Sequence, residues 1–565
     1  MPCRENIVSE DYEDLIVEID TDYGTFLENN KDYCPILTSV NYGIIYKQMQ
    51  GRLKDRIEDY SYLEIPKLYG LMDLSAIEET GSIALQNLPN SGLKGQGVII
   101  GFIEDGIDVY NDVFRYSNGN TRLIGAWDQT NQTLTPPFNL KYGSYLTNDI
   151  INDELMKEDS QILNSLSSDS SHGTFVAGIA AGNPNREAGF ASAAPFADIA
   201  VVKLKPAKRY LRDFFAINDS AKAYQENDIL TGINFLTMLA IEKRKPLIIC
   251  ITLGSSYGAH NGFSILGNLL NELGERTGIG VCVANGNEGN ARHHFLGQIS
   301  NEGATEDVEI RVPENSKGFV LGLWGEAPDS YSIEIISPSG DRIERFGNRI
   351  RGSMDFDFIL DSTKISAQYE LVERKSGSQV IRIRFETPIA GIWTIRVYGD
   401  VIVRGNYNVW LPISEFVGDE TYFLRPNPFN TLTIPADSQV PVSVGAYDDN
   451  MSGIFIESGR GYPTNNLVKP EIVAPGVGVY GPDLNNIFVS KSGTSVSAGI
   501  TAGIMAQIME WGYVRKNSES INTIEIKNYL IRGARRRPQI EYPNREWGYG
   551  EVDVYEAFER LRGII

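Results

Sequence analysis

The stretch that decides the fold is Val98-Ile-Ile-Gly-Phe-Ile-Glu-Asp-Gly106, an apolar run that ends in two acidic residues and a glycine. Such a continuous apolar run is typical of a parallel strand that is buried on both faces of its sheet. Similar runs lie at 199–202, 247–251, 279–284 and 440–444, and a helical pattern occupies 229–241. Strands that alternate with helices predict a doubly wound α/β domain, in which chemistry gathers at the carboxyl ends of the strands.

Residues 296–430 break this pattern, because their apolar residues recur with a period of two. Residues such as Ile381 alternate with arginines, and turns such as Ser337-Pro-Ser-Gly340 separate short strand-like runs. This pattern predicts an antiparallel sandwich or jelly roll. We therefore expect a β domain inserted into the α/β domain, which it divides into residues 67–295 and 431–565.

Residues 1–66 form a third block with its own composition. They contain 6 basic and 14 acidic residues, a net charge of −8, with strand-like runs at Leu15–Ile19 and Tyr42–Tyr46. This block predicts a small acidic α+β module.

The composition limits the partners of the chain. The 565 residues include 51 Lys and Arg against 73 Asp and Glu, a net charge of −22. A surface of this sign does not attract nucleic acid or an anionic membrane as the main partner. No apolar stretch reaches the length of about 18 residues that a membrane-spanning helix needs, so no membrane span is expected.

The four cysteines lack the paired short spacings of a zinc site. Cys250 and Cys282 lie in apolar runs and are predicted to be small buried hydrophobes, whereas Cys3 and Cys34 lie in the acidic block. The N-terminus is acidic and has no apolar core of a signal peptide, so we expect synthesis and residence inside a cell.

Of the four histidines, His172 has the most informative surroundings. It lies where a polar loop turns into a helix of small residues, Ser171-His-Gly-Thr-Phe-Val-Ala-Gly178, from which its imidazole would project. In isolation, a solvated histidine at a helix start is the commoner situation. His293 and His294 are adjacent and, like His260, are expected in loops.

Ser495 lies in Lys491-Ser-Gly-Thr-Ser-Val-Ser-Ala-Gly499, where a glycine-bearing turn leads into a helix. Its hydroxyl is therefore expected at a helix N-terminus, where the dipole favours negative charge that develops on an attacked carbonyl. An ordinary N-cap serine would have the same pattern, and Thr494 or Ser492 could cap equally well.

Asn287 follows an apolar strand in Ala284-Asn-Gly-Asn-Glu-Gly289. An amide there can donate a hydrogen bond to an oxyanion, although a single asparagine in such a place is usually a turn residue.

Together these segments resemble the subtilisin-like serine proteases, in which an acid, a histidine and a serine follow one another in this order. The resemblance implies that Ser495 is the nucleophile and His172 its general base, and that Asn287 and the Ser495 N–H form the oxyanion hole. It also implies that Leu253-Gly254-Ser255 is the substrate-binding strand. No metal and no cofactor is expected, since Phe114 occupies a place where an acidic calcium ligand would be expected.

The acid of the triad departs from the family pattern. Gly106 fixes the register, so the acid that orients His172 falls on Glu104, and Asp105 takes the following position. Neighbouring strand residues point to opposite faces, so only one of the two can face the histidine. We predict Glu104; Asp105 would serve only if the strand carries a bulge. A second departure is Gly499, which stands near a usual proline and is expected to loosen the helix start.

The resemblance gives the acidic block a role as a prodomain that assists folding and places its C-terminal strand in the substrate cleft. The junction is expected near Tyr60–Lys67. A retained acidic prodomain and a jelly-roll insertion are similar to the Csp germination proteases of clostridial spores. That similarity implies a protein substrate, the precursor of a cortex-lytic hydrolase, and a spore-associated location.

Two alternatives remain. Some Csp proteins lack a complete triad, so a pseudoprotease that binds and signals in germination is the alternative to an active endopeptidase. An unrelated α/β esterase is disfavoured because Ser495 lacks a Gly-x-Ser-x-Gly elbow.

Overall fold

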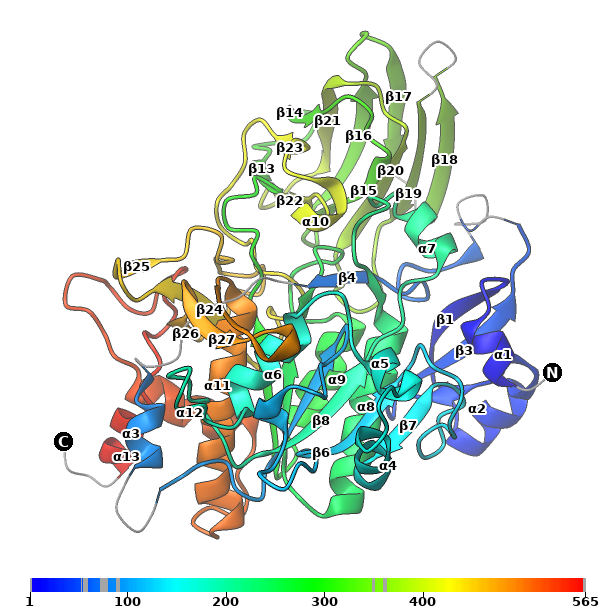
Figure 1. The fold of residues 1–565 in the computed structure, drawn as a ribbon. Coiled ribbons are helices and arrows are strands. Elements are labelled where there is room, and N and C mark those ends of the chain that lie inside the picture. The colour runs from blue at the N-terminus through cyan, green and yellow to red at the C-terminus, as the bar shows by residue number, and fades with distance from the viewer. Residues whose placement is uncertain are drawn as a thin grey trace.

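The structure is a computed structural model that describes residues 3–51, 53, 59–71, 80–87, 92–347, 351–358 and 363–561. Its centre is a nine-stranded, mostly parallel sheet in the order β25-β24-β12-β10-β5-β8-β6-β7, with β26 paired to β24 (Figure 1). The strands are β5 (Ile99–Glu104), β6 (Leu123–Asp128), β7 (Ser144–Thr147), β8 (Asp198–Lys203), β10 (Leu247–Ile251), β12 (Ile279–Ala284), β24 (Val442–Asp448), β25 (Gly453–Ile454) and β26 (Ile472–Pro475). The predicted α/β fold class is confirmed.

Helices cover both faces of this sheet. Alternate residues of β5 divide between two apolar cores: Ile100 and Phe102 pack with the helices of one face, and Ile99 and Ile103 with those of the other. The first face carries α6 (His172–Ala181), α11 (Thr494–Met509) and α12 (Thr523–Gly533), and the second carries α8 (Glu226–Lys243) and α9 (Ile265–Gly274). Cys250 and Cys282 are buried in the first core, as predicted.

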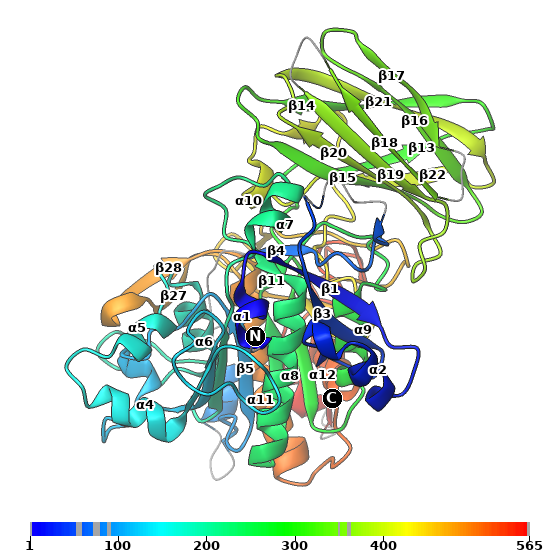
Figure 2. The ribbon, with the colours of Figure 1, turned by 90° about the vertical axis from the view of Figure 1, so that its right-hand side faces the viewer.

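The N-terminal module consists of α1 (Cys3–Val8), β1 (Tyr12–Glu18), α2 (Tyr23–Asn29), β2 (Ile36–Leu37) and β3 (Tyr42–Gln48). Its three strands form a small antiparallel sheet in the order β1-β3-β2, which packs beside α8 (Figure 2).

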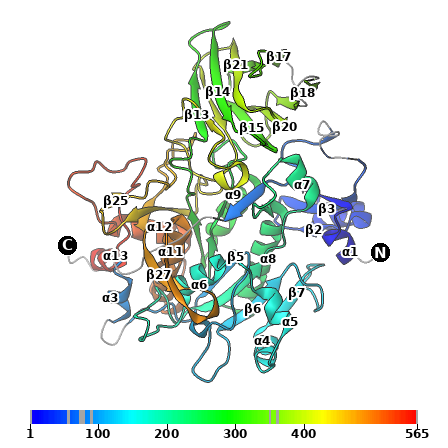
Figure 3. The same cartoon turned by 45° about the horizontal axis from the view of Figure 1, so that its top comes forward.

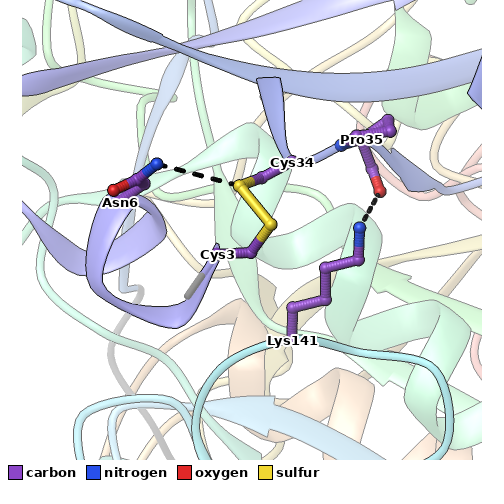
Figure 4. Close-up of a disulfide and its surroundings, with 5 residues drawn as sticks. All are labelled: Cys3, Asn6, Cys34, Pro35 and Lys141. Atoms are coloured by element: carbon purple, nitrogen blue, oxygen red, sulfur yellow. Dashed lines mark hydrogen bonds between the residues drawn. A yellow bond between two sulfur atoms is a disulfide. The ribbon is translucent and has the colours of Figure 1, made fainter. Parts of the chain in front are cut away.

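A disulfide that the cysteine spacing did not reveal joins Cys3 to Cys34, with 5.3 Å between their Cα atoms (Figure 4). The neighbouring Pro35 carbonyl accepts a hydrogen bond of 2.9 Å from Lys141 of the central domain. The disulfide therefore lies beside a contact between the module and the central domain.

Two antiparallel sheets lie between β12 and β24 in the chain and share one apolar core. The first, in the order β13-β22-β15-β20-β19-β18, contains β13 (His294–Gln298), β15 (Gly318–Gly325), β18 (Arg351–Asp357), β19 (Lys364–Glu370), β20 (Gln379–Glu386) and β22 (Asn406–Trp410). The second, in the order β17-β16-β21-β14-β23, contains β14 (Thr305–Val312), β16 (Ser330–Ile336), β17 (Arg342–Gly347), β21 (Gly391–Val401) and β23 (Tyr422–Phe423). This inserted β domain projects from the central domain (Figures 1 and 3).

Shorter elements connect these parts. The helices are α3 (Ser82–Gln86), α4 (Asn148–Leu155), α5 (Gln161–Leu166), α7 (Arg209–Phe214), α10 (Ser414–Val417) and α13 (Val554–Leu561), and a hairpin of β27 (Val479–Pro482) and β28 (Phe488–Lys491) precedes α11. A separate sheet in the order β11-β4-β9 joins β4 (Leu68–Leu71), β9 (Tyr224–Gln225) and β11 (Leu253–Gly254). None of the helices in these described ranges is long and apolar enough to cross a membrane.

Candidate active site

A serine and a histidine meet at the N-termini of two neighbouring helices. His172 is the first residue of α6 and Ser495 the second residue of α11. The His172 Nε2 atom lies 3.2 Å from the Ser495 Oγ atom. Both side chains are buried, with 6% of His172 and 0% of Ser495 exposed. The two residues are 323 positions apart in the sequence, so only the fold brings them together.

Glycines permit this approach. A Cβ atom on Gly173, directly after His172, would lie 2.2 Å from the Gly106 carbonyl oxygen and 2.8 Å from the Glu104 Cβ atom. The first turn of α6 can therefore rest on the end of β5 only with glycine at this place. Gly493 precedes α11 with a φ of 147°, a backbone conformation that favours glycine.

A buried glutamate at the end of β5 orients the histidine. The Glu104 Oε2 atom lies 2.7 Å from His172 Nδ1, and the Thr252 hydroxyl donates a hydrogen bond of 2.5 Å to Glu104 Oε1. The structure thus places Glu104 against His172. Asp105 faces elsewhere, since its carboxylate accepts hydrogen bonds from Ser168 Oγ at 2.7 Å and Lys222 Nζ at 3.2 Å.

The Asn287 side chain is oriented by the residue before the serine. Its Oδ1 atom accepts hydrogen bonds from the backbone N–H and the hydroxyl of Thr494, at 3.2 and 2.9 Å. A backbone N–H can only donate, so the amide oxygen must face Thr494 and the NH2 group points the other way. In the described part of the chain this NH2 group makes no hydrogen bond, and Asn287 lines a cavity of about 460 Å³. It can therefore donate to an oxyanion formed beside Ser495.

The residues predicted to bind substrate are divided by the structure. Leu253 and Gly254 form β11 and pair antiparallel with Leu71 and Gly70. Ser255 does not continue this strand, because its backbone N–H and carbonyl exchange hydrogen bonds of 3.1 and 2.8 Å with Ile434. Leu253 and Gly254 thus share a strand, and Ser255 follows it in a bridge to Ile434; that the three bind substrate stays a prediction.

A segment of the chain itself occupies the place beside β11. On its other edge β4 pairs antiparallel with β9, with Leu68 opposite Gln225 and Tyr69 opposite Tyr224. Residues 68–71 are thus held as the middle strand of three. The family resemblance led us to expect a strand of the N-terminal block in the cleft, but with its junction near Tyr60–Lys67, before the residues that pair with β11. Thr252 was not predicted. The position of Thr252 directly after β10, which neighbours β5 in the sheet, is the signal that could have identified it.

The other histidines lie outside this site, in the junction between the central and inserted domains. His260 and His294 both stack on Trp410, with ring centroids 4.1 and 4.9 Å away. Burial lowers the pKa of His260 to about 3 and that of His294 to about 4. The expectation that His294 lies in a loop is wrong, because it begins β13.

The described residues contain no group of three or more His, Cys, Asp or Glu side chains placed to hold a metal ion. The chemistry that this arrangement supports is acyl transfer, with a hydroxyl, an imidazole, a carboxylate and an amide donor in one place.

Comparison with known proteins gives three kinds of match. A family model described as "Subtilase family" matches residues 95–322 and 401–550. The solved structure of the Clostridium perfringens CspB protease has a TM-score of 0.75 and 29% sequence identity, and the match covers 86% of this chain and 98% of that one.

Among curated proteins, the subtilisin-like protease SBT6.1 of Arabidopsis thaliana is 33% identical over 141 residues, 24% of this chain. The PII-type proteinase of Lactococcus lactis subsp. cremoris is 21% identical over 523 residues, which is 84% of this chain and 26% of that protein. The chain matches only 13% of the length of the first of these relatives.

Proposed function

Because the chain belongs to the subtilase family, we propose that it is a serine endopeptidase with Ser495 as its nucleophile. The observation that carries the proposal is the line of contacts from Ser495 Oγ to His172 Nε2 and from His172 Nδ1 to Glu104 Oε2. A weak nucleophile next to a base that is itself oriented by a third group is the signature of an activated hydroxyl.

In the proposed reaction, Ser495 Oγ attacks the scissile carbonyl carbon while His172 Nε2 takes the hydroxyl proton. Glu104 holds the proton on His172 Nδ1 and stabilises the imidazolium that forms. The Asn287 NH2 group and the N–H of Ser495 donate to the oxyanion. His172 then gives its proton to the leaving amine, and a water molecule attacks the acyl-enzyme by the same route.

We further propose that the N-terminal module is a prodomain that the enzyme cuts off. The strand β4 runs along β11 toward the catalytic serine: Gly70 lies opposite Gly254 and Leu71 opposite Leu253. The next residue along, Thr252, carries a carbonyl oxygen that accepts a hydrogen bond of 3.4 Å from Ser495 Oγ. The strand thus approaches Ser495 in the direction of a substrate.

This register moves the proposed junction. The sequence analysis expects it near Tyr60–Lys67, but those residues precede the strand that lies on β11. We propose the bond between Met72 and Asp73, the first residues beyond β4. Residues 72–79 lie outside the described part of the chain.

The likeness to the CspB protease supports a role in spore germination. We propose that the protein substrate is the precursor of a cortex-lytic hydrolase, that the enzyme activates it by limited proteolysis, and that it is spore-associated. The antiparallel layers of the inserted β domain agree with the proposed jelly roll.

The test is to produce the wild type and Ser495→Ala side by side. The proposal predicts that only the wild type is converted into a short and a long fragment, with Asp73 as the new N-terminus of the long one. Identical migration of the two proteins would contradict it and favour the noncatalytic binding and signalling protein.

A further inference from the structure

Between β22 and β23 the chain leaves the two sheets of the inserted β domain, runs along the edge of the cleft and then returns to the second sheet. Here Ile413 leads into the short helix α10, in which Glu415 and Phe416 follow Ser414. This exit segment, Ile413–Phe416, is held in two places. Glu288 accepts a hydrogen bond of 3.0 Å from the Ser414 N–H, and Glu415 Oε1 accepts one of 3.0 Å from the Lys222 N–H.

The exit segment lies directly over one residue of the strand in the cleft. A Cβ atom built on Gly70 would lie 2.6 Å from Ile413 Cδ1, 2.9 Å from Glu415 Oε2 and 3.5 Å from Phe416 Cε1. The first two distances are shorter than packed proteins tolerate between a Cβ atom and another heavy atom, so a side chain at this place requires the side chains of Ile413 and Glu415 to shift.

The need for glycine at this position is steric and not conformational. The φ angle of Gly70 is outside the left-handed region in which glycine is preferred, so another residue could adopt this backbone. The two preceding positions of β4 are not restricted in this way, since Leu68 and Tyr69 carry large side chains that are 0% and 1% exposed.

Moving the contacting side chains aside costs free energy. Ile413 and Phe416 are 5% and 0% exposed and belong to one apolar cluster with Leu68 of β4 and Val320 of the inserted β domain. A shift of Ile413 therefore disturbs packing that joins the two domains. Displacement of Glu415 would weaken its hydrogen bond with the Lys222 N–H.

We infer that the exit segment determines specificity: it leaves room for glycine, and not for a larger residue, at the third position on the N-terminal side of the cleaved bond. This inference rests on the proposed function and on cleavage after Met72, from which Gly70 is the third residue counted back. The substrate class is then a protein segment with glycine at that place, in the chain itself and in a protein cut in trans. The inserted β domain contributes to recognition through its exit segment.

Autoprocessing tests this inference. Gly70→Ala should slow conversion of the chain about tenfold or more, and Gly70→Val should slow it further, because misfits of one or two methyl groups have effects of this size. Ile413→Ala should restore at least part of the rate to Gly70→Ala. Gly453→Ala is the matched control, since nothing lies within 4 Å of a Cβ atom there and its φ is ordinary; it should convert at the wild-type rate.

The outcomes separate the inference from the proposed function. A wild type that stays intact like Ser495→Ala contradicts the proposed function. If the wild type converts and both Gly70→Ala and Gly70→Val convert at the wild-type rate, the inference is overturned. It is also overturned if Gly70→Ala converts slowly and Ile413→Ala does not restore its rate.

A trans assay covers variants that fail to fold. Thermal unfolding of the Gly70 variants in the Ser495→Ala background reports whether they fold. If they do not, the processed wild type is given peptides with glycine or alanine at the third position before the bond. The inference expects kcat/KM to favour glycine, and Ile413→Ala to reduce that preference. Equal kcat/KM values for the two peptides would overturn it.

Discussion

Both oxygen atoms of the Glu104 carboxylate are held by hydrogen bonds. Its Oε2 atom lies 2.7 Å from His172 Nδ1, the place that the family resemblance and the register set by Gly106 together indicated for Glu104. Thr252 was missed, because its hydroxyl reaches Glu104 Oε1 from the end of β10, which becomes the neighbour of β5 only in the folded sheet. This second hydrogen bond fixes the longer glutamate side chain in place.

Glu104 and Asp105 should therefore respond very differently to loss of charge. Glu104→Gln no longer favours the tautomer with a proton on Nδ1 or stabilises the imidazolium, so kcat should fall by about 10³–10⁴. Asp105→Asn should retain kcat within about tenfold, since its partners are Ser168 and Lys222. Steady-state kinetics on a peptide substrate measures both values, and a larger loss for Asp105→Asn would contradict the assignment.

Asn287 gives a second test at this scale. Asn287→Ala removes one donor to the oxyanion and should lower kcat by about 10²–10³ with little change in KM. Asn285→Ala is an unsuitable control because Asn285 is buried and donates to the Gly459 carbonyl. Asn290, which lines the same cavity and is exposed, is the better one. Equal losses for Asn287→Ala and Asn290→Ala would contradict a specific role.

At the scale of elements, small residues set the distances between helices. Gly499 was expected to loosen the start of α11, but that helix is continuous from Thr494 to Met509. A Cβ atom at Gly499 would lie 3.2 Å from atoms of Val176 and Ile179, so this glycine lets α11 lie close to α6. The helices themselves could be predicted from local sequence, whereas their close contact depends on a facing element far along the chain.

The segment that leads into β4 is anchored on the inserted β domain. The Tyr62 ring packs edge-on against Trp324, with centroids 5.2 Å apart, and Lys67 Nζ lies 4.6 Å from its centre. Tyr62→Ala removes this buried ring, so in the uncut Ser495→Ala background it should lower the free energy of unfolding by about 3 kcal/mol. Tyr62→Phe keeps the ring and should cost much less. Chemical denaturation measures both, and equal losses would contradict the anchoring role of the ring.

At the scale of the whole molecule, composition and periodicity were sufficient for the architecture. The α/β domain, the N-terminal module and the inserted antiparallel sheets all follow from local patterns in the sequence. The Cys3–Cys34 disulfide and the strand β4 in the cleft do not, because each depends on residues that meet only after folding.

The junction of the central and inserted domains should be sensitive to acid. His260 and His294 are buried beside Trp410 with pKa values lowered to about 3 and about 4. A histidine whose pKa is lowered by folding makes its full contribution to the free energy of unfolding above its pKa in the unfolded chain, near 6.5. This contribution is lost as the pH falls toward its pKa in the folded protein. Between pH 7 and pH 5 the free energy of unfolding should fall by about 2 kcal/mol for each histidine.

Denaturation at several pH values measures this loss. The variant His260→Gln/His294→Gln lacks both titrating groups and should lose less stability over the same interval, whatever its stability at pH 7. An equal pH dependence of the variant and the wild type would contradict the assignment to these histidines.

The central claim is that Ser495 cuts the chain just beyond β4. It is tested by measuring the intact mass of the purified wild type, Ser495→Ala and Ser497→Ala. The last is the matched control, because Ser497 is buried in the same helix and donates to the carbonyls of Ala474 and Pro475. We expect two masses for the wild type and for Ser497→Ala, which sum to the uncut chain plus one water, and a single uncut mass for Ser495→Ala. Cleavage of Ser495→Ala at the same bond, or an uncut wild type, would contradict it.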